Sequence, residues 1–122
     1  MIKLTFCLRR LPSLTLGEFQ DYWLNTHAPL VAERAEVLNI VRYQQVHTAD
    51  VGGMHDAMRA RNGGAPEPFD GVAELWWNSL EEMRSDTDAA RVASAELLAD
   101  ERNFIDLPNS PMWIAEEHRI VG

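Results

Sequence analysis

The chain is organised around residues 18–30, which read Glu18-Phe19-Gln20-Asp21-Tyr22-Trp23-Leu24-Asn25-Thr26-His27-Ala28-Pro29-Leu30. At about 100° per residue, the apolar side of a helix formed by this stretch contains Phe19, Trp23, His27 and Leu30. The histidine therefore points toward the expected core. Two interpretations are open: a packed core histidine whose ring nitrogens are satisfied by neighbouring groups, or a residue with a chemical role.

The ends of this helix are also marked in the sequence. Thr15 and Glu18 match a capping box, in which each side chain satisfies a backbone N–H of the other residue. The helix is expected to continue to about Leu38. Pro29 interrupts it, because proline has no N–H to donate to the Asn25 carbonyl four residues earlier. This predicts a kink or a restart of the helix at the proline.

Four stretches are typical of β-strands, by alternation or by β-branched and aromatic content: residues 2–9, 39–48, 72–77 and 112–120. A second helical stretch begins after Ser79, and residues 86–88 are expected to divide it because aspartates favour caps over helix interiors. The order β-α-β-β-α-β predicts a ferredoxin-like, split-βαβ fold of the α+β class. The 122 residues suit one domain, residues 1–122.

Residues 49–69 join the second and third strands and hold four of the seven glycines and two of the six prolines. A short helix is expected within them, at residues 54–60. A connection of this length is uncommon in a compact domain unless it has a function. A lid over a ligand and a flexible insertion without a role are both open interpretations.

The strands predict a second copy of the chain as a partner. Two helices cover only one face of a four-stranded sheet, yet adjacent large apolar residues occur at Ile40-Val41 and at Leu75-Trp76-Trp77. Because side chains alternate along a strand, both faces must carry apolar groups. The uncovered face would be a large exposed patch on a monomer. We therefore expect a homodimer in which two sheets pack face to face as a dimeric α/β barrel.

Composition excludes several partners. The formal net charge of −8 would repel a nucleic acid or an anionic membrane surface, so neither is expected as a partner. No apolar run approaches the roughly 20 residues that span a bilayer, and the N-terminus lacks the apolar segment of a signal peptide. The single cysteine, Cys7, cannot form a disulfide within the chain, which fits a reducing cytoplasm.

Motifs for metals and cofactors are missing from the sequence. The four histidines show none of the usual ligand spacings, and neither a Walker A loop nor a dinucleotide fingerprint occurs. We therefore expect no metal and no cofactor. Cys7 lies in the middle of a strand and is interpreted as a small buried residue. His27 remains as a candidate general base, because apolar surroundings favour the neutral imidazole, and Tyr43 as a group that stabilises a carbonyl or enolate oxygen.

The same residues resemble a known family. Tyr22-Trp23 followed by Thr26-His27-Ala28-Pro29-Leu30 resembles the signature of the EthD family, and residues 70–76, 100–106 and 116–118 resemble later segments of that family in the same order. The resemblance implies a dimeric α/β barrel. The family includes a cofactor-free methylmuconolactone isomerase that works by proton transfer, whose histidine and tyrosine fall on His27 and Tyr43. Fungal polyketide-pathway dehydratases or oxygenases are also relatives, and EthD itself is associated with a cytochrome P450 ether-degrading system.

Two main hypotheses follow. The first is a cofactor-independent isomerase, lyase, dehydratase or oxygenase that acts on a small apolar carbonyl, lactone or aromatic polyketide-like compound. His27 and Tyr43 would carry the chemistry, in a pocket formed by Phe19, Trp23, Leu30 and Trp76. The second is a non-catalytic accessory protein that binds a small hydrophobic molecule for an oxidoreductase partner. Cofactor-free oxidation of a quinol is a third possibility within the same pocket.

Overall fold

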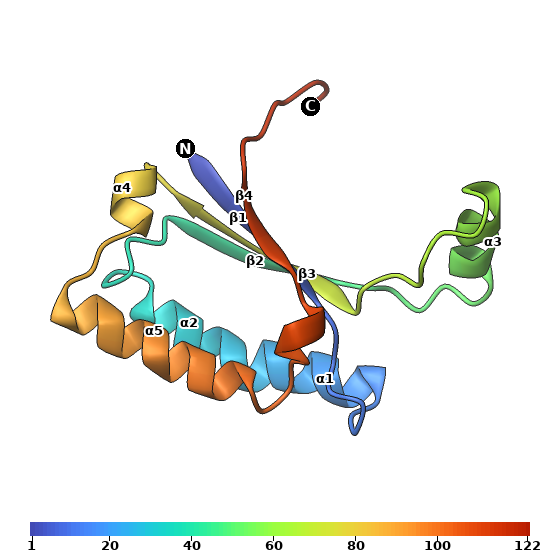
Figure 1. Cartoon of the computed structure of the whole chain (residues 1–122), viewed down its shortest axis with the longest axis horizontal. Helices are drawn as coiled ribbons and strands as arrows, with labels where there is room; N and C mark the ends of the chain where they lie inside the picture. The colour runs from blue at the N-terminus through green and yellow to red at the C-terminus, as the bar shows by residue number, and fades with distance from the viewer.

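A computed structural model describes residues 1–122 and contains one antiparallel sheet of four strands. The strands are β1 (Ile2–Leu8), β2 (Arg42–His47), β3 (Gly71–Trp77) and β4 (Met112–Ala115), in the order β2-β3-β1-β4. The helices α1 (Leu16–Tyr22), α2 (Ala28–Arg34) and α5 (Asp88–Glu101) lie together on one face of this sheet (Figure 1). This is the predicted ferredoxin-like fold.

The first helix contains a π-helical turn. The predicted capping box is present: Thr15 and Glu18 each accept a hydrogen bond from the backbone N–H of the other. After α1 the chain forms a π turn at Trp23–His27, in which the Ala28 N–H donates to the Trp23 carbonyl. Pro29 follows in the first turn of α2, where its ring is accommodated directly after the widened turn. The predicted restart is therefore a widened turn just before the proline.

This widened turn changes which residues face the sheet. Phe19, Trp23, His27 and Val31 are buried, whereas Leu30 is only partly buried. The prediction that Leu30 completes the apolar face was wrong, because it assumed 100° per residue throughout. A π turn bonds over five residues instead of four, so the buried position moves by one residue. The helix also ends at Arg34, earlier than predicted.

The second half follows the predicted plan with shorter elements. The predicted division of the helix is confirmed: α4 (Leu80–Met83) is separate, and the Thr87 hydroxyl caps α5 by accepting from the Ala90 N–H. β2 starts later than predicted, since Asn39 has a left-handed backbone with φ of 60°. β4 is shorter than predicted because its partner β1 begins at Ile2, leaving a single residue of β1 beyond the Lys3–Ala115 pair.

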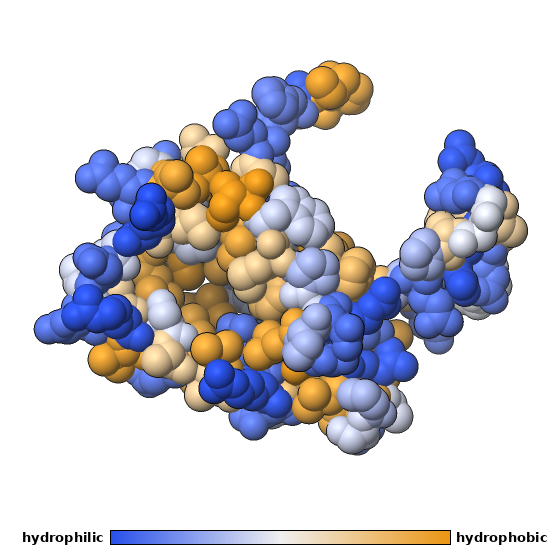
Figure 2. All heavy atoms as spheres, in the orientation of Figure 1, coloured by the Kyte–Doolittle hydropathy of each residue, from blue (hydrophilic) through white to orange (hydrophobic).

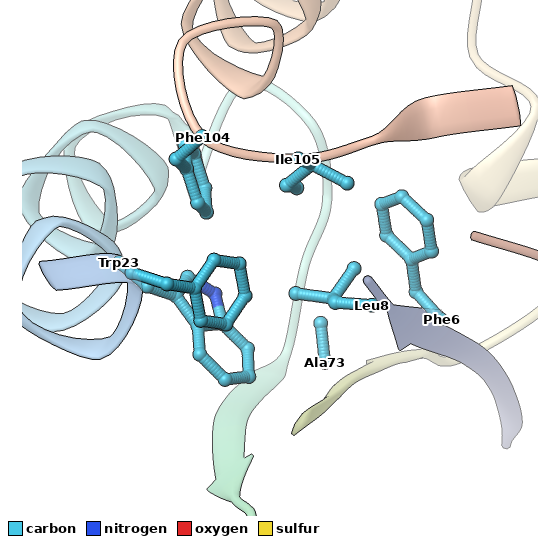
Figure 3. Packing of buried hydrophobic residues seen from close by; sticks show 7 residues of the cluster. Phe6, Leu8, Trp23, Ala73, Phe104 and Ile105 are labelled. Atoms are coloured by element: carbon cyan, nitrogen blue, oxygen red, sulfur yellow. The ribbon is translucent and has the colours of Figure 1, made fainter. Parts of the chain in front are cut away.

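A cluster of buried side chains holds the helices on the sheet. Figure 3 shows Trp23 from the π turn, Phe104 and Ile105 from the segment after α5, and side chains of β1 and β3 pointing toward one another. The Phe19 ring centroid lies 5.6 Å from those of both Trp23 and Phe104. Aromatic pairs at this separation contribute favourable packing beyond the area they bury.

Residues 49–69 project away from the body of the molecule (Figure 1). The short helix predicted there is present as α3 (Met54–Arg61), and none of its residues is buried. The base of the projection is held by Arg9, whose guanidinium donates to the carbonyls of Pro68 and Glu67 at 2.6 and 3.1 Å. No helix in the chain has both the length and the apolar character that crossing a membrane would need.

The face of the sheet opposite the helices is of mixed character. Trp113 on β4 and Val46 on β2 are exposed. Lys3 and Glu74 lie on the two strands between them and form an ion pair. Trp76 is only 4% exposed, because Lys3 and other long side chains cover its ring. The predicted apolar patch is therefore smaller and more charged than the strand sequences indicated.

Candidate functional site

A cavity of about 360 Å³ lies between the sheet and helices α2 and α5. Figure 2 shows it as a hollow whose interior is lined by hydrophobic side chains. Its volume falls within the range of small-molecule sites in proteins. Eighteen residues line it, and fifteen are hydrophobic. Chemistry is possible at the three polar exceptions, His27, Ser94 and Glu101, and at the hydroxyl of Tyr43, which is counted with the hydrophobic residues.

His27 is held by a carboxylate from another helix. Its Nδ1 atom lies 2.7 Å from Oδ2 of Asp100, and Oδ1 of Asp100 accepts a hydrogen bond of 2.6 Å from the Tyr22 hydroxyl. An ionised carboxylate only accepts hydrogen bonds, so Nδ1 carries the proton of the neutral ring. Nε2 has no protein partner and is not completely buried, and His27 is one of the residues that line the cavity. Nε2 is therefore the ring nitrogen that remains available to a ligand.

The protonation states suit a base. Burial lowers the pKa of His27, and the bond to Asp100 and its charge offset this only in part. Burial raises the pKa of Asp100, but hydrogen bonds from Tyr22 and His27 outweigh it, and the net pKa is lowered. Near neutral pH the pair is therefore a neutral imidazole beside an ionised carboxylate.

Tyr43 is oriented by the amide of Gln45. The amide nitrogen donates to the Tyr43 hydroxyl oxygen at 2.8 Å and to the Trp23 carbonyl at 2.9 Å, while the amide oxygen accepts from His47 Nε2 at 2.7 Å. With all its groups engaged, Gln45 has one favourable orientation. The Tyr43 oxygen is thus an acceptor toward Gln45, and its own proton remains for a ligand in the cavity. Burial raises the pKa of Tyr43, so the phenol keeps this proton.

Glu101 is the third polar group of the cavity and follows Asp100 directly in the chain. Burial, together with the charge of Asp100, raises its pKa to about 7. Its carboxyl group forms no ion pair with any Lys or Arg. Sequence reasoning missed both Asp100 and Glu101 as site residues. The available signal was two adjacent acids in the last turn of a helix, where acids are normally disfavoured.

Trp23 forms a wall of the cavity and requires a glycine opposite it. A Cβ atom added at Gly71 would lie 2.4 Å from Cζ3 of Trp23 and 2.9 Å from the Val46 carbonyl oxygen. The Trp23 ring also stacks on His47, the register partner of Gly71 on β2, with centroids 4.4 Å apart. The indole position is therefore fixed by its contacts with both strands.

The structure separates the predicted pocket residues. Trp23, together with His27 and Tyr43, lines the cavity, whereas Phe19 lies in the core behind it. Leu30 does not line the cavity, and Val31 lines it instead because of the π turn. Trp76 faces the opposite side of the sheet. The neighbouring Trp77 lines the cavity in its place, since adjacent residues of a strand point to opposite faces. No group of three His, Cys, Asp or Glu side chains is arranged to hold a metal ion.

Comparison with known proteins identifies the family. The model of the EthD domain matches residues 11–108, so the chain belongs to the EthD family, as the sequence resemblance indicated. An EthD family protein from Bacillus halodurans is 20% identical with a TM-score of 0.58, over 97% of this chain and 100% of the other. An EthD-like protein from Ralstonia eutropha is 20% identical with a TM-score of 0.59, over 94% and 89% of the two chains.

A third structure is more distant in sequence. It is a dimeric protein of unknown function and ferredoxin-like fold from Bacteroides fragilis, 9% identical with a TM-score of 0.57, over 95% of each chain. At these identities the likeness shows the fold alone. No curated protein gives a significant sequence match.

Proposed function

We propose that this protein is a cofactor-independent enzyme that transfers protons on a small, apolar carbonyl compound, lactone or aromatic polyketide-like compound. The observation that carries the proposal is the His27–Asp100 pair in the wall of a largely apolar cavity. A carboxylate that orients a histidine, with the other ring nitrogen directed at a ligand site, is an arrangement suited to general-base catalysis. An isomerase, a lyase or an oxygenase could use this arrangement.

The base would act through Nε2 of His27. This nitrogen takes a proton from a carbon next to the substrate carbonyl, and the carboxylate of Asp100 stabilises the imidazolium that forms. A positioned general base supplies roughly 10²–10⁴-fold in rate. The Tyr43 hydroxyl donates to the carbonyl oxygen, where negative charge develops as the proton leaves.

The cavity favours an uncharged substrate. No Lys or Arg is among its lining residues, and Asp100 lies directly behind His27. A bound carboxylate would therefore lose its hydration without gaining a countercharge. The aliphatic and aromatic walls suit the hydrocarbon part of the substrate instead.

The protein is further proposed to act as a homodimer that pairs through the open face of its sheet. Exposed Trp113 and Val46 on this face support the proposal, because burying them would stabilise a pair of sheets. The Bacteroides fragilis relative is described as dimeric. Lys3 and Glu74, which pair within one chain, would then lie in or beside the interface.

A second candidate function is a binding protein without chemistry. The same cavity would hold a hydrophobic metabolite for an oxidoreductase partner, and the net charge of −8 favours a basic docking surface on that partner. The binding protein would need the cavity but not the free nitrogen of His27.

Two variants of His27 separate these functions. Ligands are first found by a thermal-shift screen of lactones, quinols and anthrone-like compounds. Turnover of the ligands is then followed for the wild type, His27→Ala and His27→Gln, since Gln keeps a donor toward Asp100 without a base. His118→Ala, at an exposed position, is the control. A loss of about 100-fold or more with binding retained supports the enzyme, and turnover within a few-fold of the wild type contradicts it. Binding with no turnover by any form favours the binding protein.

A further inference from the structure

Glu101 is a second titratable group on the ligand side of the site, and the reaction described above does not use it. It is the last residue of α5 and lines the cavity together with His27 and Tyr43. None of the ion pairs or side-chain hydrogen bonds of the chain engages its carboxyl group. An ionised carboxyl group in an apolar cavity costs free energy when no protein group pairs with it, so the protonated acid is favoured there.

Its place in the helix is unfavourable as well. The C-terminal end of a helix carries partial negative charge and is normally occupied by Lys, Arg or His. The last turn of α5 has no basic residue and holds Asp100 and Glu101 side by side. Both acids therefore oppose the helix dipole and repel each other when ionised. Neither helix capping nor solubility explains why two acids occupy the last turn of α5.

The two acids are directed to different places. Asp100 reaches Nδ1 of His27 at 2.7 Å, whereas Glu101 lines the same cavity as His27. One helix end thus supplies a carboxylate bonded to the base and a carboxyl group in the wall of the cavity. A ligand in the cavity would meet both His27 and Glu101 in its walls.

We propose that Glu101 is the general acid of this site and works together with His27 as the general base. The inference rests on the proposed function. With a β,γ-unsaturated ketone or lactone, Nε2 of His27 takes the α-carbon proton, the electron pair moves to the carbonyl oxygen, and the Glu101 proton passes to that oxygen. This gives a dienol, an imidazolium and a carboxylate. The imidazolium then protonates the γ-carbon while the dienol O–H returns its proton to Glu101, so the double bond shifts and both residues are restored.

The charges around Glu101 support a protonated resting state. Asp100 on α5 and Arg102 just after it act on Glu101 in opposite directions. Tyr43 on β2 is neutral, and His27 in the π turn is neutral as well. Burial and Asp100 prevail over Arg102, and the pKa of Glu101 rises to about 7. Because burial lowers the pKa of His27, base and acid are both in their active forms just below neutral pH.

The test uses α-angelica lactone, a β,γ-unsaturated lactone, and deuterium uptake by α-tetralone, each followed against pH. The wild type should show a bell-shaped kcat/KM, with an acidic limb from His27 and an alkaline limb near the pKa of Glu101. Glu101→Gln should lower kcat/KM by about tenfold or more and remove the alkaline limb. His27→Gln should abolish the reaction. Glu36→Gln, an exposed charge change, should match the wild type.

A readout without turnover accompanies it. Carbon-13 NMR of the Glu side-chain carboxyls should show one group titrating near neutral pH that is missing in Glu101→Gln. Titration of Glu101 at an ordinary acidic pKa would overturn the inference. So would a Glu101→Gln variant that keeps the wild-type rate and alkaline limb while His27→Gln is inactive, and the proposed function would then stand. A wild type no faster than buffer on either compound, or a His27→Gln variant as active as the wild type, would overturn both.

Discussion

His27 and Asp100 are 73 residues apart in sequence, yet Nδ1 of one lies 2.7 Å from Oδ2 of the other. The histidine comes from the first βαβ half of the chain and the carboxylate from the last helix. Tyr22 joins the pair through the second carboxylate oxygen. The candidate site therefore forms only when the helices of the two halves pack side by side on the sheet.

Asp100→Asn should weaken catalysis and stability together. The amide no longer stabilises the imidazolium, and two donors, Nδ1 of the buried His27 and the hydroxyl of the partly buried Tyr22, must share its one oxygen. Leaving a buried donor unpaired costs about 1–3 kcal/mol. Urea unfolding measures this loss, and nitrogen-15 NMR of the imidazole should show a larger fraction of the other tautomer. An unchanged tautomer with unchanged turnover would exclude Asp100 as a positioning residue.

Tyr43→Phe tests the oxygen-stabilising role. The loss of one hydrogen-bond donor to a developing oxyanion costs roughly 10²–10³-fold in kcat. Because the ring remains in the cavity wall, the KM for an apolar ligand should change much less. Steady-state kinetics measures kcat and KM separately. A rise in KM with unchanged kcat would show that the phenol contributes to binding only.

Gly71→Ala should displace the Trp23 ring. Its new Cβ would lie 2.4 Å from Cζ3 of Trp23, which is far inside van der Waals contact, and overpacking of this kind costs about 1–3 kcal/mol. We expect a lower melting temperature, altered tryptophan fluorescence and weaker ligand binding. Gly17→Ala is the matched control, because a Cβ there meets no atom within 4 Å and the position lies in α1. Equal effects of the two substitutions would contradict the packing argument.

Glu101 should make stability depend on pH. Its folded-state pKa of about 7 lies above its ordinary value of 4.5, so its contribution is fully present below the ordinary value and is lost as pH rises through 7. His27 acts in the opposite sense: its pKa is lowered, so its contribution is present above its ordinary value of 6.5 and is lost in acid. The difference in unfolding free energy between the wild type and Glu101→Gln isolates the first effect. From acidic to alkaline pH, the unfolding free energy of the wild type should fall by up to about 3 kcal/mol relative to that of the variant. A constant difference would show that Glu101 has an ordinary pKa.

Trp113→Glu should dissociate the proposed dimer. The side chain is 49% exposed in the single chain and lies on the open face of the sheet. A charge there would be buried without a partner if two sheets pack together. Sedimentation velocity at micromolar concentration should give a dimer for the wild type and a monomer for the variant. Val92→Glu, an exposed change on α5, should leave the mass unchanged.

The sequence predicted local features better than the site as a whole. Thr15 marks a helix start through its own hydroxyl, and this signal needs only neighbouring residues. The break at residues 86–88 was local as well, although the cap there is Thr87 and not one of the aspartates on which the prediction rested. The pairing of Asp100 with His27 depends on how two distant helices pack, which no local pattern contains. The choice between Trp76 and Trp77 is of the same kind, because alternation places one on each face without saying which. His27 itself was identifiable because a histidine on an apolar helix face is unusual.

The π turn at Trp23–His27 amounts to one extra residue in an otherwise regular helix. In genetic terms, a single inserted codon produces such a turn, and its loss would restore a plain α-helix. Deleting Asn25 would leave Trp23 and the histidine three residues apart, a spacing that still keeps both side chains on one face of an α-helix. The histidine would nevertheless meet Asp100 at a different angle, while the fold would lose little else. One codon therefore sets the position of the candidate base without setting the architecture of the domain.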